Sequence, residues 1–132
     1  MNFDTLSKWQ PIALSVLRIY TGLSIIEHGT AKILGFPAGA APSPQVGTLA
    51  WTGGMIELIG GALIIVGLLT RPVAFIMAGF TAVAYFMVHA PQSFFPIVNK
   101  GELAAVNCFV FLYLIFAGAG PLSLDAVLRK KA

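Results

Sequence analysis

The sequence predicts an all-α fold, a four-transmembrane-helix bundle with a short C-terminal interfacial helix. Hydrophobic residues make up 58% of the chain and charged residues only 10%, whereas soluble domains carry roughly 25% charged residues. Four apolar stretches each approach the roughly 20 residues that a helix needs to cross a bilayer core. They lack the sustained alternation of membrane strands, so helices are the expected elements.

The four expected spans form a single domain, residues 1–132, and leave no room for a separate soluble domain. They cover residues 11–34, 48–69, 72–89 and 102–118. Glycine and proline mark the connections, which read GFPAGAAPSP, TRP, APQSFFP and, after the last span, GAGP.

A cleavable signal peptide is the competing interpretation of the first span. Lys8 precedes the apolar run, and the sequence from Ala38 to Ala40 resembles a cleavage site. The run is long for a signal peptide and carries several charges near its end, so we expect a retained membrane helix.

The positions of Lys and Arg predict the orientation of the helices. With a cytoplasmic N-terminus, only Lys32 and Lys100 lie at the edges of the outer loops. The cytoplasmic side then holds Lys8, Arg71, Arg129, Lys130 and Lys131. Both termini are therefore expected to be cytoplasmic, and the net charge of +3 attracts anionic lipid head groups without requiring a nucleic-acid partner.

The tail PLSLDAVLRKKA has the residue order of a short interfacial helix. Ser123 is suited to cap its N-terminus, Asp125 falls in its first turn, and basic residues follow at its end. We expect this helix to anchor the chain at the membrane surface.

Polar residues within the spans are expected to gather in the outer half of the bilayer. Glu27 and His28 lie roughly 10 Å inside the outer end of the first span, and Glu57 lies at a comparable depth in the second. Asn107 lies about 8 Å into the fourth span, and three further polar residues lie at the outer boundary. The candidate ligand-binding residues are His28, Lys32, Glu57, His89, Glu102 and Asn107.

Glu57 is the centre of this expected site. Glycines three and four residues away on either side share its helical face and allow neighbouring backbones to approach closely. These glycines are Gly53, Gly54, Gly60 and Gly61. A lone carboxylate in hydrocarbon costs about 2.5 to 3.5 kcal/mol, so Glu57 should be protonated or paired. Its candidate partners are His28, Lys32 and His89.

Glu27 projects about 100° around the helix from His28 and is expected to face another neighbour or a subunit. Glu27 and Gly61 are therefore the candidate partner-facing residues. Arg18 lies roughly two turns from the inner boundary, where its long side chain is expected to reach the lipid head groups. A counter-ion role deep in the bundle is the alternative for Arg18.

Several alternatives to a ligand site remain open at this point. A closed polar network that only holds the helices in register would also explain Glu57, His28 and Asn107. Cys108 is the only cysteine, which excludes an intrachain dithiol cycle. Zinc or haem held by His28 and His89 has suitable ligands but no supporting spacing motif, so no metal is predicted. The glycines form no phosphate-binding loop.

Three runs of the sequence form a recognisable set: LRIYTGLSIIEHGTAKILGFP, GGMIELIGGALIIVGLLTRPVAFIMAG and NKGELAAVNCFVFLYLIFAGAGPLSLD. Together they resemble the DoxX family of small four-helix membrane proteins, and the resemblance covers residues 17–125. Its most recognisable parts are His28, Gly29 and Lys32 ahead of Gly35 and Phe36, Glu57 with its glycines, the turn at Thr70 and Arg71, and the segment 120–125.

The resemblance implies a compact multi-pass bundle in a bacterial inner (plasma) membrane that acts beside partners. Family members are associated with an archaeal terminal quinol oxidase and with thiosulfate:quinone oxidoreductase. Bacterial relatives are linked to membrane complexes that handle thiol or oxidative stress. The resemblance brings no catalytic residue set with it, so it leaves open whether this chain is an enzyme.

Together these features favour a quinone-linked redox subunit that binds a quinone or similar amphipathic molecule in the outer half of the bundle. His28 or Lys32 would donate to a carbonyl oxygen and Glu57 would move protons, while Glu102 and His89 would connect the site to outer water. Its expected partners are the lipid bilayer and a membrane or periplasmic redox protein, in an oligomer or complex. The alternative is a non-enzymatic assembly or structural subunit; transport would require an oligomer.

Overall fold

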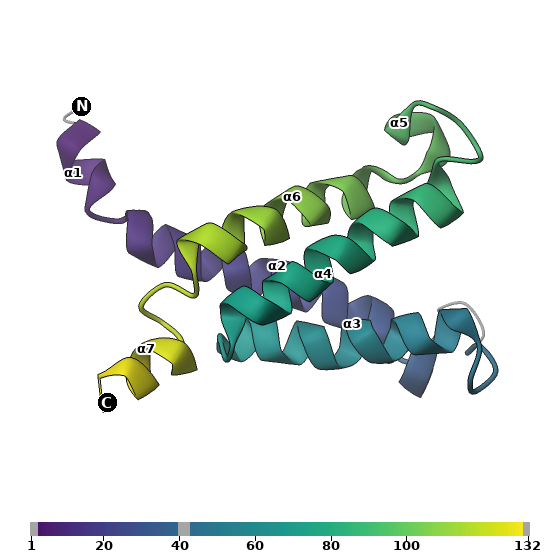
Figure 1. Ribbon diagram of the computed structural model, residues 1–132, viewed down its shortest axis with the longest axis horizontal. Coiled ribbons are helices and arrows are strands. Elements are labelled where there is room, and N and C mark those ends of the chain that lie inside the picture. Colours follow the sequence, from purple (N-terminus) through teal and green to yellow (C-terminus); the bar gives the residue numbers. More distant parts are fainter. Residues whose placement is uncertain (1–2, 40–42, 131–132) are drawn as a thin grey trace.

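A computed structural model describes residues 3–39 and 43–130, and helices are the only regular elements in these ranges (Figure 1). The prediction of an all-α chain is therefore confirmed. Ala40 of the cleavage-like sequence and Lys131 of the predicted basic cluster lie outside the described residues. The elements are α1 (Phe3–Ser7), α2 (Gln10–Leu34), α3 (Leu49–Val66), α4 (Thr70–Ala84), the π-helical turn η1 (Tyr85–His89), α5 (Pro96–Asn99), α6 (Glu102–Ala117) and α7 (Leu124–Arg129).

The four long helices pack chiefly as two pairs, α2 with α3 and α4 with α6, and α3 joins the pairs through α4. α1 and α7 lie at one end of the bundle, and α5 lies at the other (Figure 1). Apolar side chains from all four helices fill the centre between the pairs. The buried core consists of Ile25, Ile64, Val73, Ala74, Met77, Ala78, Phe111 and Leu114.

Two helical segments, Leu49–Val66 and Thr70–His89, are long and apolar enough to cross a membrane. α6 is apolar but shorter, at 16 residues. α2 has 25 residues, but charged side chains interrupt its apolar sequence. The structure thus provides two candidate spans, and the expected total of four spans stays a prediction.

The C-terminal helix begins where the sequence predicts, because the Ser123 hydroxyl accepts a hydrogen bond from the Ala126 amide at 3.2 Å. Asp125 has a further role that the sequence does not reveal. Its carboxylate accepts hydrogen bonds from the amides of Leu69 (2.8 Å) and Thr70 (2.9 Å). α4 therefore starts at Thr70, two residues before the predicted start of the third span.

The environment of Asp125 favours its charged form. Burial by itself raises the pKa of the Asp125 carboxyl, but the hydrogen bonds from Thr70 and Leu69 and the charge of Arg129 outweigh this effect. The pKa of Asp125 is therefore lower than its ordinary value. An ionised carboxylate at this position is the better acceptor for the unsatisfied amides at the start of α4.

The expectation that Arg18 reaches the lipid head groups is wrong, because its side chain is completely buried. Its guanidinium donates to the Ala119 carbonyl at 2.8 Å and to the carbonyls of Ile64, Ile65 and Leu122. The Ile64 and Ile65 carbonyls belong to the last turn of α3, where carbonyls lack a regular helical partner; the Ile64 carbonyl also accepts from the Gly67 amide at 3.2 Å. Arg18 therefore connects α2 with the end of α3 and with the segment between α6 and α7.

Glycines allow α2 and α3 to lie in close contact. A Cβ atom at Gly29 would lie 2.7 Å from the Cα of Leu58, and one at Gly61 would lie 3.0 Å from the Cα of Ile26. Gly54 similarly leaves room for Lys32, whose Cβ would lie 2.8 Å from an added Cβ. The close approach predicted for the glycines around Glu57 is confirmed, and α2 contributes matching glycines of its own.

Replacing Gly29 with Ala is expected to lower the free energy of unfolding by about 1 to 3 kcal/mol. The added methyl group meets the backbone of Leu58, which can move only if the two helices separate. Thermal unfolding in detergent, followed by circular dichroism, measures the effect.

Gly79→Ala is the matched control, since a Cβ at Gly79 in α4 has no neighbour within 4 Å. Greater helix propensity should leave this variant as stable as the wild type or more stable, by up to about 1 kcal/mol. Equal stability of the two variants would contradict the proposed role of Gly29.

Candidate functional site

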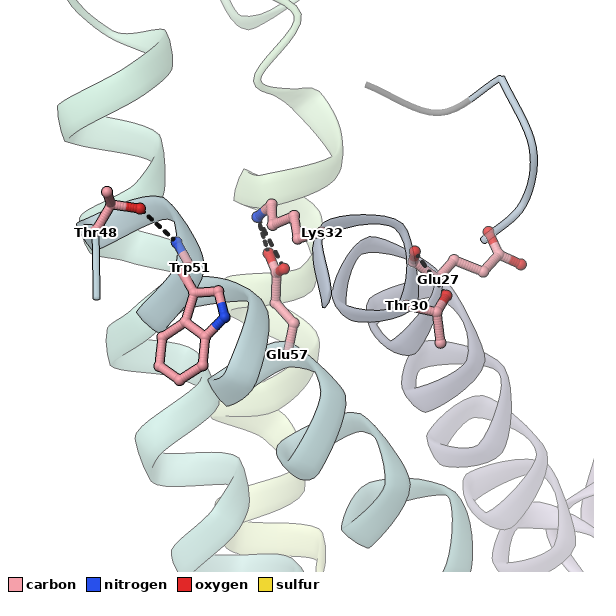
Figure 2. A network of polar contacts seen from close by, with 6 residues as sticks. All are labelled: Glu27, Thr30, Lys32, Thr48, Trp51 and Glu57. Atoms are coloured by element: carbon pink, nitrogen blue, oxygen red, sulfur yellow. Dashed lines mark hydrogen bonds and ion pairs between the residues drawn. The ribbon is translucent and has the colours of Figure 1, made fainter. Parts of the chain in front are cut away.

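An ion pair joins the last turn of α2 to the middle of α3 (Figure 2). The Lys32 Nζ donates to both carboxylate oxygens of Glu57, at 2.9 and 2.8 Å. The Glu57 side chain is 9% exposed and the Lys32 side chain is 36% exposed. Of the partners considered for Glu57, the structure therefore selects Lys32, and the absence of a side chain at Gly54 makes room for it.

A cavity of about 230 Å³ lies beside this pair, at the α5 end of the bundle. It brings together side chains from α2, α3, α4, η1 and α6. Five of the six candidate ligand-binding residues line it, namely His28, Lys32, Glu57, His89 and Asn107. The remaining lining residues are Ile25, Phe80, Thr81, Ala84, Val88, Lys100, Leu103 and Ala104.

Asn107 is a largely buried residue of the cavity. It is 5% exposed and lines the cavity from α6. Its amide makes no hydrogen bond with any residue in the described ranges. The two donors and the acceptor of this amide are therefore available for a molecule in the cavity.

The orientation of His89 is fixed by Asn99, which the sequence analysis did not single out. The Nδ1 of His89 lies 3.0 Å from the carbonyl oxygen of Asn99. A carbonyl oxygen can only accept, so Nδ1 carries a proton, and in the neutral ring Nε2 is the acceptor. His89 also stacks with Tyr85, the first residue of the π-helical turn η1, at a ring distance of 6.3 Å.

Asn99 is itself held firmly. It is 1% exposed, its amide nitrogen donates to the Ser93 carbonyl at 2.8 Å, and its Oδ1 accepts from the Gly101 amide at 2.7 Å. The local sequence Asn99-Lys100-Gly101 was the available signal, because such residues are typical of tight turns. Lys100 does adopt a left-handed conformation, with φ of 58°.

Three candidate residues lie elsewhere. Glu102 is exposed at the start of α6 and does not line the cavity. Gly61 is buried against Ile26 of α2, so its expected partner-facing position is wrong: the chain's own helix covers it. Glu27 is exposed and points away from the Lys32–Glu57 pair (Figure 2). His28 lines the cavity but is itself exposed, which places it at the rim.

No group of three His, Cys, Asp or Glu side chains that could hold a metal ion occurs within residues 3–39 and 43–130. The alternative zinc site built on His28 and His89 therefore has no complete ligand set there. Cys108 is a free, partly buried thiol. The groups available in the cavity are two amines, a carboxylate and two imidazoles, which can form hydrogen bonds and exchange protons, and an amide, which can form hydrogen bonds.

The fold and this cavity define a class of protein: a small, highly apolar helical protein with polar groups buried near one end of the bundle. The model of the DoxX family matches residues 13–90, which is more than half of the chain. This protein belongs to the DoxX family and is a membrane protein.

The related proteins cover almost the whole chain. An uncharacterized protein of Haemophilus influenzae is 42% identical, over 97% of this chain and 99% of its own length. The inner membrane protein YqjF of Escherichia coli K12 is 30% identical, over 96% of this chain and 99% of its own length. A second uncharacterized H. influenzae protein is 30% identical over 90% of this chain and 85% of its own length. No solved structure matches the chain.

The Lys32–Glu57 pair can be tested with a double-mutant cycle. Lys32→Met leaves the Glu57 carboxylate buried without its partner and is expected to lower the free energy of unfolding by about 1 to 3 kcal/mol. This loss is smaller than the loss for a fully buried pair, because Lys32 is partly exposed. Adding Glu57→Gln should recover part of this loss. Thermal unfolding of the four proteins in detergent measures the coupling.

Lys100→Met is the control, since Lys100 lines the same cavity but forms no ion pair with a described carboxylate. It is expected to have little effect. Additive effects of the Lys32 and Glu57 substitutions would show that the two residues do not interact in the membrane protein.

Proposed function

We propose that this protein is a quinone-linked subunit of the bacterial inner membrane that binds the head group of a quinone or a similar small amphipathic molecule in the cavity. The observation that carries the proposal is the amide of Asn107, a residue only 5% exposed that lines the same cavity as the Lys32–Glu57 pair and makes no hydrogen bond with a described residue. Its donors and acceptor are available to a hydrogen-bonding ligand.

The size of the cavity favours a head group with a tail outside it. About 230 Å³ is below the 300 to 1,000 Å³ that is typical of pockets for drug-sized ligands. Val88 and Leu103 line the cavity and are 57% and 46% exposed. An apolar tail could therefore leave past these side chains into the surrounding lipid.

The polar groups of the cavity suit the carbonyl oxygens of a quinone. Two of the three Lys32 N–H donors bond to Glu57, which leaves the third for one oxygen, and the Asn107 amide can donate to the other. Reduction to a quinol takes up two electrons and two protons. The electrons would come from a membrane or periplasmic redox partner, and Glu57 and Lys32 could exchange protons with the head group.

The orientation of the bundle in the membrane belongs to the same proposal. α1 and α7, the first and last helices, lie at the same end of the bundle (Figure 1), which carries Lys8, Arg71, Arg129 and Lys130. The positive-inside rule places that end in the cytoplasm and the cavity in the outer half of the membrane. The E. coli relative is named an inner membrane protein, which supports a location in the inner membrane.

Titration of a short-chain quinone into the protein in nanodiscs, followed by calorimetry, tests the proposal. The wild type should bind saturably, and Asn107→Leu should weaken binding about tenfold or more, since it removes a buried hydrogen bond. Glu102→Gln, which changes a carboxylate at the same end but outside the cavity, should bind like the wild type. No binding by the wild type at any accessible concentration would end the quinone proposal.

A second function, assembly of a membrane complex without catalysis, is favoured by Glu27. Its side chain is exposed on α2, away from the ion pair (Figure 2). Charged residues inside membrane segments usually face protein or water rather than lipid, so a partner helix with a basic or hydrogen-bonding group would satisfy Glu27.

Purification in mild detergent tests this second function. The wild type should carry a stoichiometric protein partner that Glu27→Ala loses, because the substitution removes the exposed carboxylate that would bond to the partner. Glu102→Ala, an exposed carboxylate at the start of α6, serves as the control and should keep the partner. Isolation of the wild-type chain without any partner would argue against the assembly function.

A further inference from the structure

A second cavity, of about 310 Å³, lies at the opposite end of the bundle from the candidate quinone site. It is formed where the start of α4 meets α7 and the connection that follows α6. Its lining residues are Leu69, Thr70, Arg71, Pro72, Gly118, Ala119, Asp125, Leu128 and Arg129. We propose that this cavity binds the head group of an anionic phospholipid through Arg71 and Arg129.

The two arginines keep most of their hydrogen-bond donors available. Arg71 donates from Nη1 to the Ile115 carbonyl at 2.8 Å, and Arg129 donates from Nε to the Asp125 carbonyl at 3.2 Å. Each guanidinium has five N–H donors, so four on each make no hydrogen bond with a residue that the structure describes. A planar guanidinium binds two phosphate oxygens at once, which suits a phosphodiester between the two side chains.

The carboxylate of Asp125 also lines this cavity, but it is already occupied. Both of its oxygens accept backbone hydrogen bonds, from Leu69 and Thr70 at the start of α4. Two arginines against one aspartate leave a net positive charge in the lining. The backbone at Gly118 has φ of 81° and no side chain, and an added Cβ would lie 3.4 Å from the Arg71 Nη2, so glycine keeps the space beside Arg71 open.

The apolar walls favour a lipid over free phosphate. Leu69 and Leu128 are 59% and 54% exposed in the cavity lining, and Pro72 lies with them. These side chains offer a surface for acyl chains directly beside the phosphate-binding groups. Since lipid phosphates lie at the boundary of the hydrocarbon core, a cavity at the end of the bundle is at the right depth to receive one.

Native mass spectrometry of the detergent-purified protein tests the inference with three probes: phosphatidylglycerol, phosphatidylcholine and inorganic phosphate. The wild type should retain phosphatidylglycerol in preference to the other two. Arg129→Gln and Arg71→Gln should each weaken this binding roughly tenfold, the loss expected for a charge-assisted hydrogen bond. Lys8→Gln, which removes an exposed cation at the same end of the bundle, should leave it unchanged.

Equal binding of phosphatidylcholine, or wild-type affinity in Arg129→Gln, would overturn the inference. So would inorganic phosphate binding as tightly as phosphatidylglycerol, because acyl chains would then contribute nothing. Arg71 also bonds to α6, so Arg71→Lys, which keeps the charge but loses two-point binding, is the second variant at this position. Among the described residues, Arg129 bonds only within its own helix. The result is independent of quinone binding at the other end.

Discussion

The close contact between α2 and α3 is the constraint on which the rest of the structure depends. Lys32 reaches Glu57 only because Gly54 has no side chain beneath it, and Gly29 lets α2 rest directly on the backbone of α3. A wider separation of the two helices would leave the Glu57 carboxylate buried and unpaired, which is far costlier than the loss of an exposed pair. Packing and electrostatics at this site therefore cannot be changed independently.

Polar groups at the other end of the bundle set the positions of α4 and α6. Arg18 joins α2 to the end of α3 and to the segment after α6, while Asp125 binds the first amides of α4. Because helices are stiff, fixing one end of α4 and α6 also fixes the other end. His89, in the π-helical turn η1 that continues α4, and Asn107 of α6 thereby reach the same cavity.

The sequence predicted features that depend on spacing along one helix. The positions of the helices, the cap at Ser123 and the glycine face around Glu57 follow from local periodicity. The sequence could not predict features that depend on how each helix is rotated about its axis and on which residues, distant in sequence, pack against it. Arg18 is buried and donates to carbonyls that lie far from it in the sequence. Asn99 contacts His89 only because the loop between them folds back. Gly61 lies on the same face of α3 as Glu57, and it packs against α2 of the same chain rather than against a partner protein.

The balance of charge in the candidate quinone site bears on what it can bind. Lys32 and Glu57 neutralise each other and Asn107 is uncharged, whereas Lys100 adds one positive charge to the lining. A cationic ligand would have to compete with Lys32 for the Glu57 carboxylate, and Lys100 would repel it. A neutral head group with two acceptor oxygens needs only the remaining Lys32 donor and the Asn107 amide. The proposed quinone meets this requirement without separating the Lys32–Glu57 pair.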